Sequence, residues 1–189
     1  MVLEAQKKMT ATEFDEWAES QTGDAIFEFI SGEIIEKMPS NGYSSMLATR
    51  IIIRIGIYLL QNNIGYLTTE AGGYKIGDER YVPDVAFVTY EKQKHPNKKG
   101  FNNVIPDLVV EVISDSGNKH ELRDLRRKIT GYLNAGTIVW VVDADEKQVE
   151  IHRMGQNPRV LGMNDVLTAP DLLPNFSLAG KDIFEDENQ

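Results

Sequence analysis

The spacing of apolar residues along the chain switches between the periods of helices and of strands. Apolar side chains recur every three or four positions over residues 44–61 and again over 118–135, which predicts two amphipathic helices. A shorter first helix should begin at Thr10, because Thr10 and Glu13 have the spacing of a capping box, and should end near Gly23.

Shorter apolar runs predict the strands. Residues 25–30 and 33–37 flank Ser31-Gly32 and are typical of a β-hairpin. Further strands are expected in these segments: about 66–75 and 81–88, joined through Gly77-Asp78, then 107–113, 137–143 and 148–154. The runs at 107–113 and 137–143 are almost continuously apolar, which is typical of strands inside a sheet.

The order of these elements predicts an α/β fold with a mixed sheet. A strand, a helix and a strand at this spacing form a right-handed crossover between parallel strands, and the strand at 148–154 should pair back through the turn at 145–147. The length of 189 residues favours a single domain, 1–189. We expect its core to span about residues 25–155, with a frayed acidic tail over 181–189.

The amino-acid composition excludes several kinds of functional site. The chain has no cysteine, which excludes disulfides, thiolate zinc sites and cysteine nucleophiles, and its three histidines lie far apart at positions 95, 120 and 152. A metal would therefore be held mainly by carboxylate oxygens, which points to Mg²⁺ or Mn²⁺. No glycine-rich phosphate loop and no serine–histidine–aspartate set is found.

The charge and hydropathy of the chain indicate whether nucleic acids or membranes are expected partners. The net charge of −9 argues mildly against nonspecific binding to nucleic acid, although residues 91–128 carry an excess of Lys and Arg that could contact a polyanion. The most apolar stretch, around 47–60, is interrupted by Arg50 and Arg54, and the N-terminus lacks the apolar segment of a signal peptide. We expect a cytoplasmic protein with no membrane partner.

Two carboxylates stand in strands that should be apolar. Asp84 follows Pro83 in the strand at 81–88, and Glu111 lies in the middle of the strand at 107–113. Burying an unpaired carboxylate costs several kcal/mol, so Glu111 needs a cation, a proton or an opening to solvent. One interpretation is a salt bridge to an arginine such as Arg126. The other is a divalent-metal site built by Asp84 and Glu111 on neighbouring strands.

Lys128 favours the second interpretation. At 100° per residue it lies about 60° from Leu125 and about 40° from Tyr132 on the predicted helix, beside the buried stripe. A lysine next to two metal-binding carboxylates is suited to phosphodiester hydrolysis, because the metal neutralises phosphate charge and activates water while the ammonium group positions that water. A surface lysine with a partly buried stem is the simpler alternative.

These motifs resemble those of a known nuclease family. YVPDVAFV (residues 81–88) and PDLVVEVIS (106–114) are similar to the two halves of the PD-(D/E)xK pattern. With FEFISGE (27–33), KITGY (128–132) and VWVVD (139–143), the chain more narrowly resembles the Uma-two family of restriction-endonuclease-like proteins from about residue 10 to 184.

The resemblance implies a restriction-endonuclease-like core with an added N-terminal helix and hairpin. It further implies Mg²⁺, with Mn²⁺ as a substitute, and DNA as the substrate. Edge strands and exposed apolar helix faces would support a homodimer, which cutting of both DNA strands often requires. Asp84 and Glu111 would be metal ligands, Lys128 the catalytic lysine, and Glu33 an additional catalytic acid and metal ligand from the hairpin. The strict pattern has lysine where this chain has Ile113, so Lys128 on the following helix would supply it.

Other polar residues are secondary candidates. Glu28 lies on the same hairpin as Glu33, Asp107 shares a strand face with Glu111, and Ser114 and Asp115 end that strand. Asp143 is expected only to precede a turn. Two functions of other classes stay open at this point: a non-catalytic nucleic-acid-binding or assembly module on the same fold, and a purely structural homo-oligomer.

Overall fold

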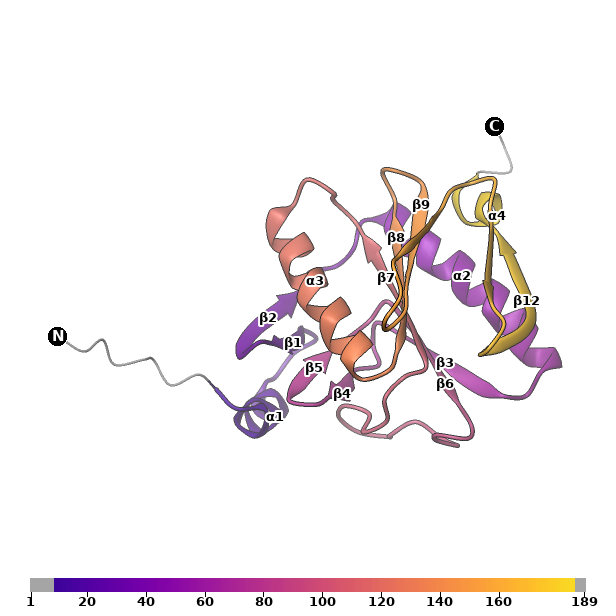
Figure 1. The fold of residues 1–189 in the computed structure, drawn as a ribbon. Coiled ribbons are helices and arrows are strands. Elements are labelled where there is room, and N and C mark those ends of the chain that lie inside the picture. Colours follow the sequence, from indigo (N-terminus) through magenta and orange to yellow (C-terminus); the bar gives the residue numbers. More distant parts are fainter. Residues whose placement is uncertain (1–8, 186–189) are drawn as a thin grey trace.

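Four helices and twelve strands make up the computed structural model, which describes residues 9–185 (Figure 1). The helices are α1 (Ala11–Ser20), α2 (Gly42–Gln61), α3 (Lys119–Asn134) and α4 (Gly180–Phe184). The strands are β1 (Ile26–Ile30), β2 (Glu33–Lys37), β3 (Gly65–Thr69), β4 (Tyr74–Ile76), β5 (Glu79–Tyr81), β6 (Val85–Thr89), β7 (Leu108–Ile113), β8 (Ile138–Asp143), β9 (Gln148–His152), β10 (Arg159–Leu161), β11 (Val166–Ala169) and β12 (Leu173–Ala179).

A six-stranded mixed sheet with the order β10-β9-β8-β7-β6-β3 forms the centre of the fold. Strands β7 and β8 are parallel and are joined by the crossover helix α3, whereas β8–β9 and β6–β7 are antiparallel, so the predicted crossover and mixed sheet are confirmed. Helices α2 and α3 cover opposite faces of this sheet (Figure 1). The two hydrophobic clusters follow from this: Leu47 and Ile51 of α2 pack with one, and Tyr132 of α3 packs with the other.

A second sheet of four strands has the order β2-β1-β5-β4. It contains the N-terminal hairpin, which lies on the α3 side of the central sheet. The hairpin forms as predicted, with Phe29 opposite Ile34 and a turn at Ser31-Gly32, where both residues have positive φ. Helix α1 begins at the predicted capping box and buries Phe14 against Phe29, with the ring centroids 5.1 Å apart. Asp15 of α1 binds the buried Arg80 of β5 at 2.7 Å, which fixes the helix to this sheet.

Two segments differ from the sequence predictions. The strand expected over 66–75 is two strands in different sheets, because the chain turns at Glu70-Ala71, where the N–H of Gly72 donates to the carbonyl oxygen of Thr69 at 2.8 Å. A side chain on Gly73 would overlap the ring of Phe101. The tail expected to fray from residue 181 instead forms α4, whose Ile183 and Phe184 are buried. The core therefore extends beyond residue 155, because β11, β12 and α4 pack onto the α2 side of the sheet. Residues 186–189 of that tail lie outside the described residues.

Helix α2 is long and apolar enough to cross a membrane by length and composition alone, despite Arg50 and Arg54. Such a helix is also typical of a protein core, and Ile51 and Ile55 of α2 are fully buried against the sheet. Arg50 donates to the carbonyl oxygen of Ile183 at 2.8 Å, so this polar side chain serves tertiary packing.

Candidate active site

Asp84 lies between Pro83 and the first residue of β6, at the edge where β6 meets the carboxyl half of β7. Its Oδ2 accepts a hydrogen bond of 2.8 Å from the backbone N–H of Val112, and its Oδ1 lies 2.8 Å from Nζ of Lys37 at the end of β2. The same lysine donates to the carbonyl oxygen of Val82 at 2.7 Å. The Asp84 carboxylate is therefore held by two strands, and its side chain is still 12% exposed.

Glu111 projects from the middle of β7 toward α3. Alternation along the strand puts it on the same face as Val109 and Ile113, which both pack in the α3-side cluster. Its Oε1 lies 2.7 Å from Nζ of Lys128 and accepts a hydrogen bond of 3.1 Å from the hydroxyl of Tyr132. A buried carboxylate in an apolar strand is thus paired and hydrogen-bonded, as its burial requires.

Lys128 joins the hairpin to the central sheet. Its Nζ lies 2.9 Å from Oε1 of Glu28 on β1 as well as against both oxygens of Glu111, and the side chain is only 6% exposed. Glu28 Oε1 also accepts a hydrogen bond of 2.7 Å from the backbone N–H of Val82. Two segments far apart in sequence, the hairpin and the crossover helix, are therefore linked by one buried ammonium group.

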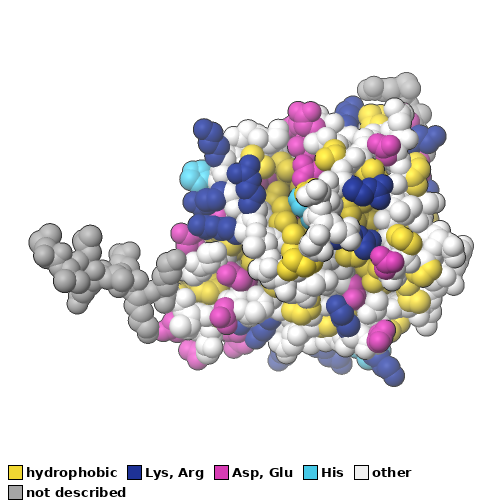
Figure 2. Space-filling model, in the orientation of Figure 1, with side chains coloured by type: hydrophobic (Ala, Val, Ile, Leu, Met, Phe, Trp, Pro, Cys, Tyr) yellow, Lys and Arg dark blue, Asp and Glu magenta, His cyan; other side chains and the backbone are white. Residues whose placement is uncertain are grey.

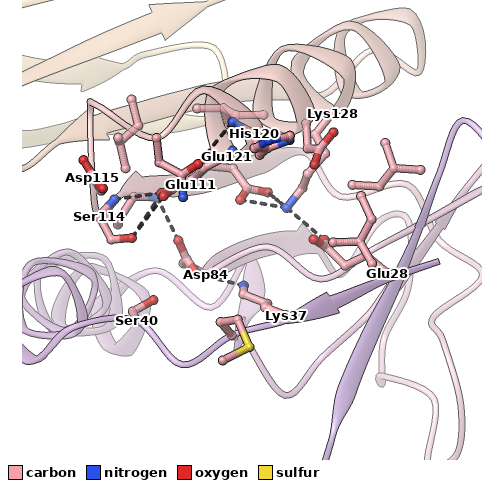
Figure 3. A pocket seen from close by; sticks show the side chains of 18 of the residues that line it. Glu28, Lys37, Ser40, Asp84, Glu111, Ser114, Asp115, His120, Glu121 and Lys128 are labelled. Atoms are coloured by element: carbon pink, nitrogen blue, oxygen red, sulfur yellow. Dashed lines mark hydrogen bonds and ion pairs between the residues drawn. The ribbon is translucent and has the colours of Figure 1, made fainter. Parts of the chain in front are cut away.

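These side chains line one cavity of about 460 Å³ (Figure 3). Its lining includes Glu28, Asp84 and Glu111 as carboxylates and Lys37 and Lys128 as ammonium groups. With all of them ionised, three negative charges face two positive charges. The lining also includes Glu36, Asp115, Glu121 and Asp124, so carboxylates outnumber ammonium groups and an incoming cation would neutralise part of the excess negative charge.

For both Glu111 and Lys128, burial and the charge of the paired group have opposite effects on the pKa. Burial raises the pKa of the Glu111 carboxyl to about 7, although the nearby Lys128 acts to lower it. For Lys128, burial alone would lower the pKa, but the Glu111 and Glu28 carboxylates outweigh it and hold the pKa well above its ordinary value. Lys128 is therefore a permanent cation at neutral pH, whereas Glu111 changes charge there.

The carboxylates of the cavity are the possible ligands of a divalent cation. Among residues 9–185, no group of three or more His, Asp or Glu side chains is arranged to hold a metal ion. Mg²⁺ needs fewer protein ligands than that, because it keeps several waters and is commonly bound through one or two carboxylates. Asp84 and Glu111 face the same cavity and supply that number, so the donors fit a hydrated Mg²⁺ or Mn²⁺.

The structure brings together Asp84, Glu111 and Lys128 but does not bring Glu33 to them. Glu33 shares a face of the hairpin with Lys37, but it is four residues, or about 13 Å, away along the strand. Its carboxylate is half exposed and lies 2.8 Å from Arg127 on the outside of α3. The hairpin acid that does enter the cavity is Glu28.

The alternative of a Glu111–Arg126 salt bridge is not found, since Lys128 takes that place. Asp107 directly precedes β7 and so lies at the end of the strand away from the cavity. Its carboxylate accepts a hydrogen bond from the N–H of Thr89 and pairs with Lys92 at 2.9 Å. The basic stretch after β6 therefore lies at the sheet end opposite the cavity, because β6 and β7 are antiparallel.

The remaining candidates are divided between the cavity and the turns. Ser114 and Asp115 line the cavity, and the N–H of Ser114 donates to Glu121 of α3 at 2.9 Å. Asp143 accepts from the N–H groups of Asp145 and Glu146 and so shapes the turn before β9, as predicted.

Lys37 and the Tyr132 hydroxyl were not assigned to the site from the sequence. Strand alternation places Lys37 on the same face of the hairpin as Glu28 and Glu33, but it does not show which of the three reaches the site. Tyr132 was predicted as part of the buried stripe of α3, which it is, and its hydroxyl additionally fixes Glu111.

Basic side chains gather on the surface beside this cavity. Figure 2 shows dark blue side chains grouped at the left, over α3, with acidic side chains below them. Lys119, Arg123 and Arg126 lie exposed on that helix, although Arg123 is paired with Asp124 at 2.9 Å. An acidic molecule thus has exposed basic side chains on the helix that also lines the candidate site.

Comparisons with known proteins find a nuclease family and a nuclease-like fold. A family model, Uma2, described as "Putative restriction endonuclease", matches residues 11–180. Among solved structures, the "crystal structure of a putative nuclease belonging to DUF820" from Anabaena variabilis has a TM-score of 0.78 at 22% sequence identity, and covers 93% of this chain and 97% of that chain. At this identity the likeness shows a shared fold. A search of curated proteins finds no match.

Proposed function

The chain belongs to the Uma2 family of putative restriction endonucleases, and from this premise we propose that it is a metal-dependent endonuclease that hydrolyses DNA phosphodiester bonds. The observation that carries the proposal is the convergence of Asp84, Glu111 and Lys128 on one cavity from β6, β7 and α3. It supports a PD-(D/E)xK-type site whose lysine has moved from the strand to the following helix.

The proposed roles follow from the contacts of each group. Asp84 and Glu111 would hold Mg²⁺, or Mn²⁺ in its place. When bound, such an ion supplies charge neutralisation at the phosphate and lowers the pKa of water. Glu28 and Glu111 hold the Lys128 ammonium group in place, and Tyr132 holds the Glu111 carboxylate.

Lys128 acts as a cation and hydrogen-bond donor in this proposal. Because its pKa lies well above the ordinary value, with the two carboxylates outweighing burial, it does not lose a proton near neutral pH. It therefore orients the attacking water or a phosphate oxygen, and the alternative role of deprotonating that water is disfavoured.

The basic face of α3 would contact the substrate backbone. Lys119 and Arg126 are exposed on a face of α3 that does not line the cavity and can neutralise phosphates, which is the main source of affinity for nucleic acids. The lysines at 92–99 lie at the other end of the sheet, so contact with the same phosphates is assigned to α3 alone.

We also propose a homodimer, which sedimentation velocity would test against a monomer.

The test is cleavage of a supercoiled plasmid with Mg²⁺ or Mn²⁺ by the unaltered protein, Glu111→Ala and Glu150→Ala. Glu150 is a matched control, because it is a glutamate of β9, two strands from β7 in the same sheet, that does not line the cavity and pairs with His152. We expect nicking by the unaltered protein and Glu150→Ala and none by Glu111→Ala. Equal residual cleavage by all three would indicate a contaminant and contradict the proposal.

One observation favours a second function. Every carboxylate oxygen of Glu111 already has a protein partner, so the site is also a closed ion-pair network that could serve a non-catalytic nucleic-acid-binding module. Calorimetric titration with Mn²⁺ separates the two functions. The nuclease binds Mn²⁺ and loses this binding in Glu111→Ala, whereas the module shows no difference between the two proteins.

A further inference from the structure

The two ammonium groups of the cavity are held in different ways. Lys128 contacts three carboxylate oxygens from two glutamates and is nearly inaccessible. Lys37 contacts one carboxylate oxygen, Oδ1 of Asp84 at 2.8 Å, and one carbonyl oxygen, that of Val82 at 2.7 Å. Its side chain is 17% exposed, against 6% for Lys128, so Lys37 is the less firmly held of the two.

Lys37 also has space to move. A second cavity of about 560 Å³ lies toward the start of α2, and it shares Lys37, Asp84 and Val112 with the first. The Lys37–Asp84 pair therefore stands at the junction of two open spaces, as Figure 3 shows for the first. A lysine stem is long and flexible, so the ammonium group can leave Asp84 without backbone movement.

The contacts of Lys37 are those that a metal cation would make. A carboxylate oxygen and a backbone carbonyl oxygen are hard oxygen ligands of the kind that Mg²⁺ takes. A divalent ion bound to Asp84 would meet the Lys37 ammonium group at contact distance, where like charges repel strongly. Both cations cannot be held by Asp84 at once without a large cost.

We propose that Lys37 is an internal counter-ion that competes with the divalent cation for Asp84 and is displaced when the ion binds. This inference rests on the proposed metal-dependent function and adds the residue that sets the metal concentration at which the site fills. In the metal-free protein the ammonium group neutralises Asp84, so the fold does not depend on the ion.

The test is calorimetric titration with Mn²⁺, without nucleic acid, of the unaltered protein, Lys37→Met and Lys37→Arg. The matched control is Lys92→Met, because Lys92 also contacts one aspartate oxygen, Asp107 at 2.9 Å, and one carbonyl oxygen, that of Ile105 at 3.2 Å, but lies at the other end of the sheet. We expect Lys37→Met to bind Mn²⁺ at least about threefold more tightly, as removal of a nearby, partly screened charge predicts. Lys37→Arg and Lys92→Met should not bind more tightly.

The outcomes separate this inference from the proposed function. Binding of equal or weaker affinity in Lys37→Met, or a similar gain in Lys92→Met, overturns the inference while the metal site stands. No Mn²⁺ binding by any of the proteins overturns both. Binding by Lys37→Met alone supports the inference, because the ammonium group then blocks the site. Thermal unfolding checks each variant, and Lys37→Gln replaces Lys37→Met if the latter does not fold.

Discussion

Oε1 of Glu28 lies 2.9 Å from Nζ of Lys128, although one residue belongs to the N-terminal hairpin and the other to the crossover helix. The same oxygen accepts the N–H of Val82, two residues before Asp84. Glu28 therefore connects the ammonium group of the candidate site to the segment that carries its first carboxylate. A residue of the accessory hairpin is part of the site's support.

The two hairpin acids should differ in their effects on cleavage. Because Glu28 helps to hold Lys128, Glu28→Gln should reduce plasmid cleavage by about 10–100-fold, as is usual for residues that orient a metal-site group. Glu33→Gln should retain most of the activity, because its exposed pair with Arg127 lies outside the cavity. Initial rates with Mn²⁺ measure both. A larger loss in Glu33→Gln would contradict the placement of these two acids.

Removing the buried ammonium group should destabilise the protein. Lys128→Met leaves Glu28 and Glu111 buried near each other without their shared cation, which should lower the free energy of unfolding by about 3–5 kcal/mol. Urea unfolding at neutral pH measures the change. Lys92→Met removes a lysine that is 38% exposed and should cost at most about 1 kcal/mol. Similar losses in the two variants would argue against a buried network around Lys128.

Glu111 should make stability depend on pH. Burial raises the pKa of its carboxyl from 4.5 to about 7 in the folded protein, so between these pH values the folded state binds the proton more tightly than the unfolded state. Its contribution to stability is fully present below pH 4.5 and is lost as pH rises through about 7. Urea unfolding from pH 4.5 to 7.5 should show this decline in the unaltered protein and a weaker one in Glu111→Gln. Parallel curves for the two proteins would contradict the prediction.

A glycine of α3 should not tolerate a side chain. Alanine normally stabilises a helix interior relative to glycine by about 1 kcal/mol. A Cβ at Gly131, however, would overlap the hydroxyl and ring of Tyr81, which packs edge-on against Tyr132 at 4.9 Å. Gly131→Ala should therefore lower the free energy of unfolding by about 1–3 kcal/mol.

The matched control for this substitution is Gly56→Ala in α2, where a Cβ would have no atom within 4 Å. This variant should be as stable as the unaltered protein or more stable by about 0.5–1 kcal/mol. Thermal unfolding of the two variants side by side distinguishes the packing effect from helix propensity. Equal stabilisation in both would show that Tyr81 moves aside without cost.

The central part of the site could be predicted because its residues break local rules. An acid in the middle of an apolar strand and a lysine beside a buried helix stripe each conflict with packing, and Glu111 and Lys128 resolve the conflict by pairing with each other. The parallel strands β7 and β8 could be predicted for a related reason. Their apolar runs and the helix between them allow only a crossover.

The contributions of the hairpin could not be predicted in the same way. Glu28, Glu33 and Lys37 share one face of a regular hairpin, so alternation alone cannot say which of them reaches the site. That choice depends on how the second sheet docks, through the pairing of Phe29 with Arg80 across β1 and β5. The C-terminal elements were missed for a similar reason, because α4 has only five residues and both β12 and α4 are stabilised by contacts with α2.

The assembly of the cavity from two sheets has a consequence for the newly made chain. Glu28 is synthesised early, but its partner Lys128 emerges much later, and a fragment that ends before α3 contains the hairpin and Asp84 without the ammonium group. Chemistry at this site would begin only after both sheets have docked. The order of synthesis would then keep the site incomplete until α3 has packed against the hairpin.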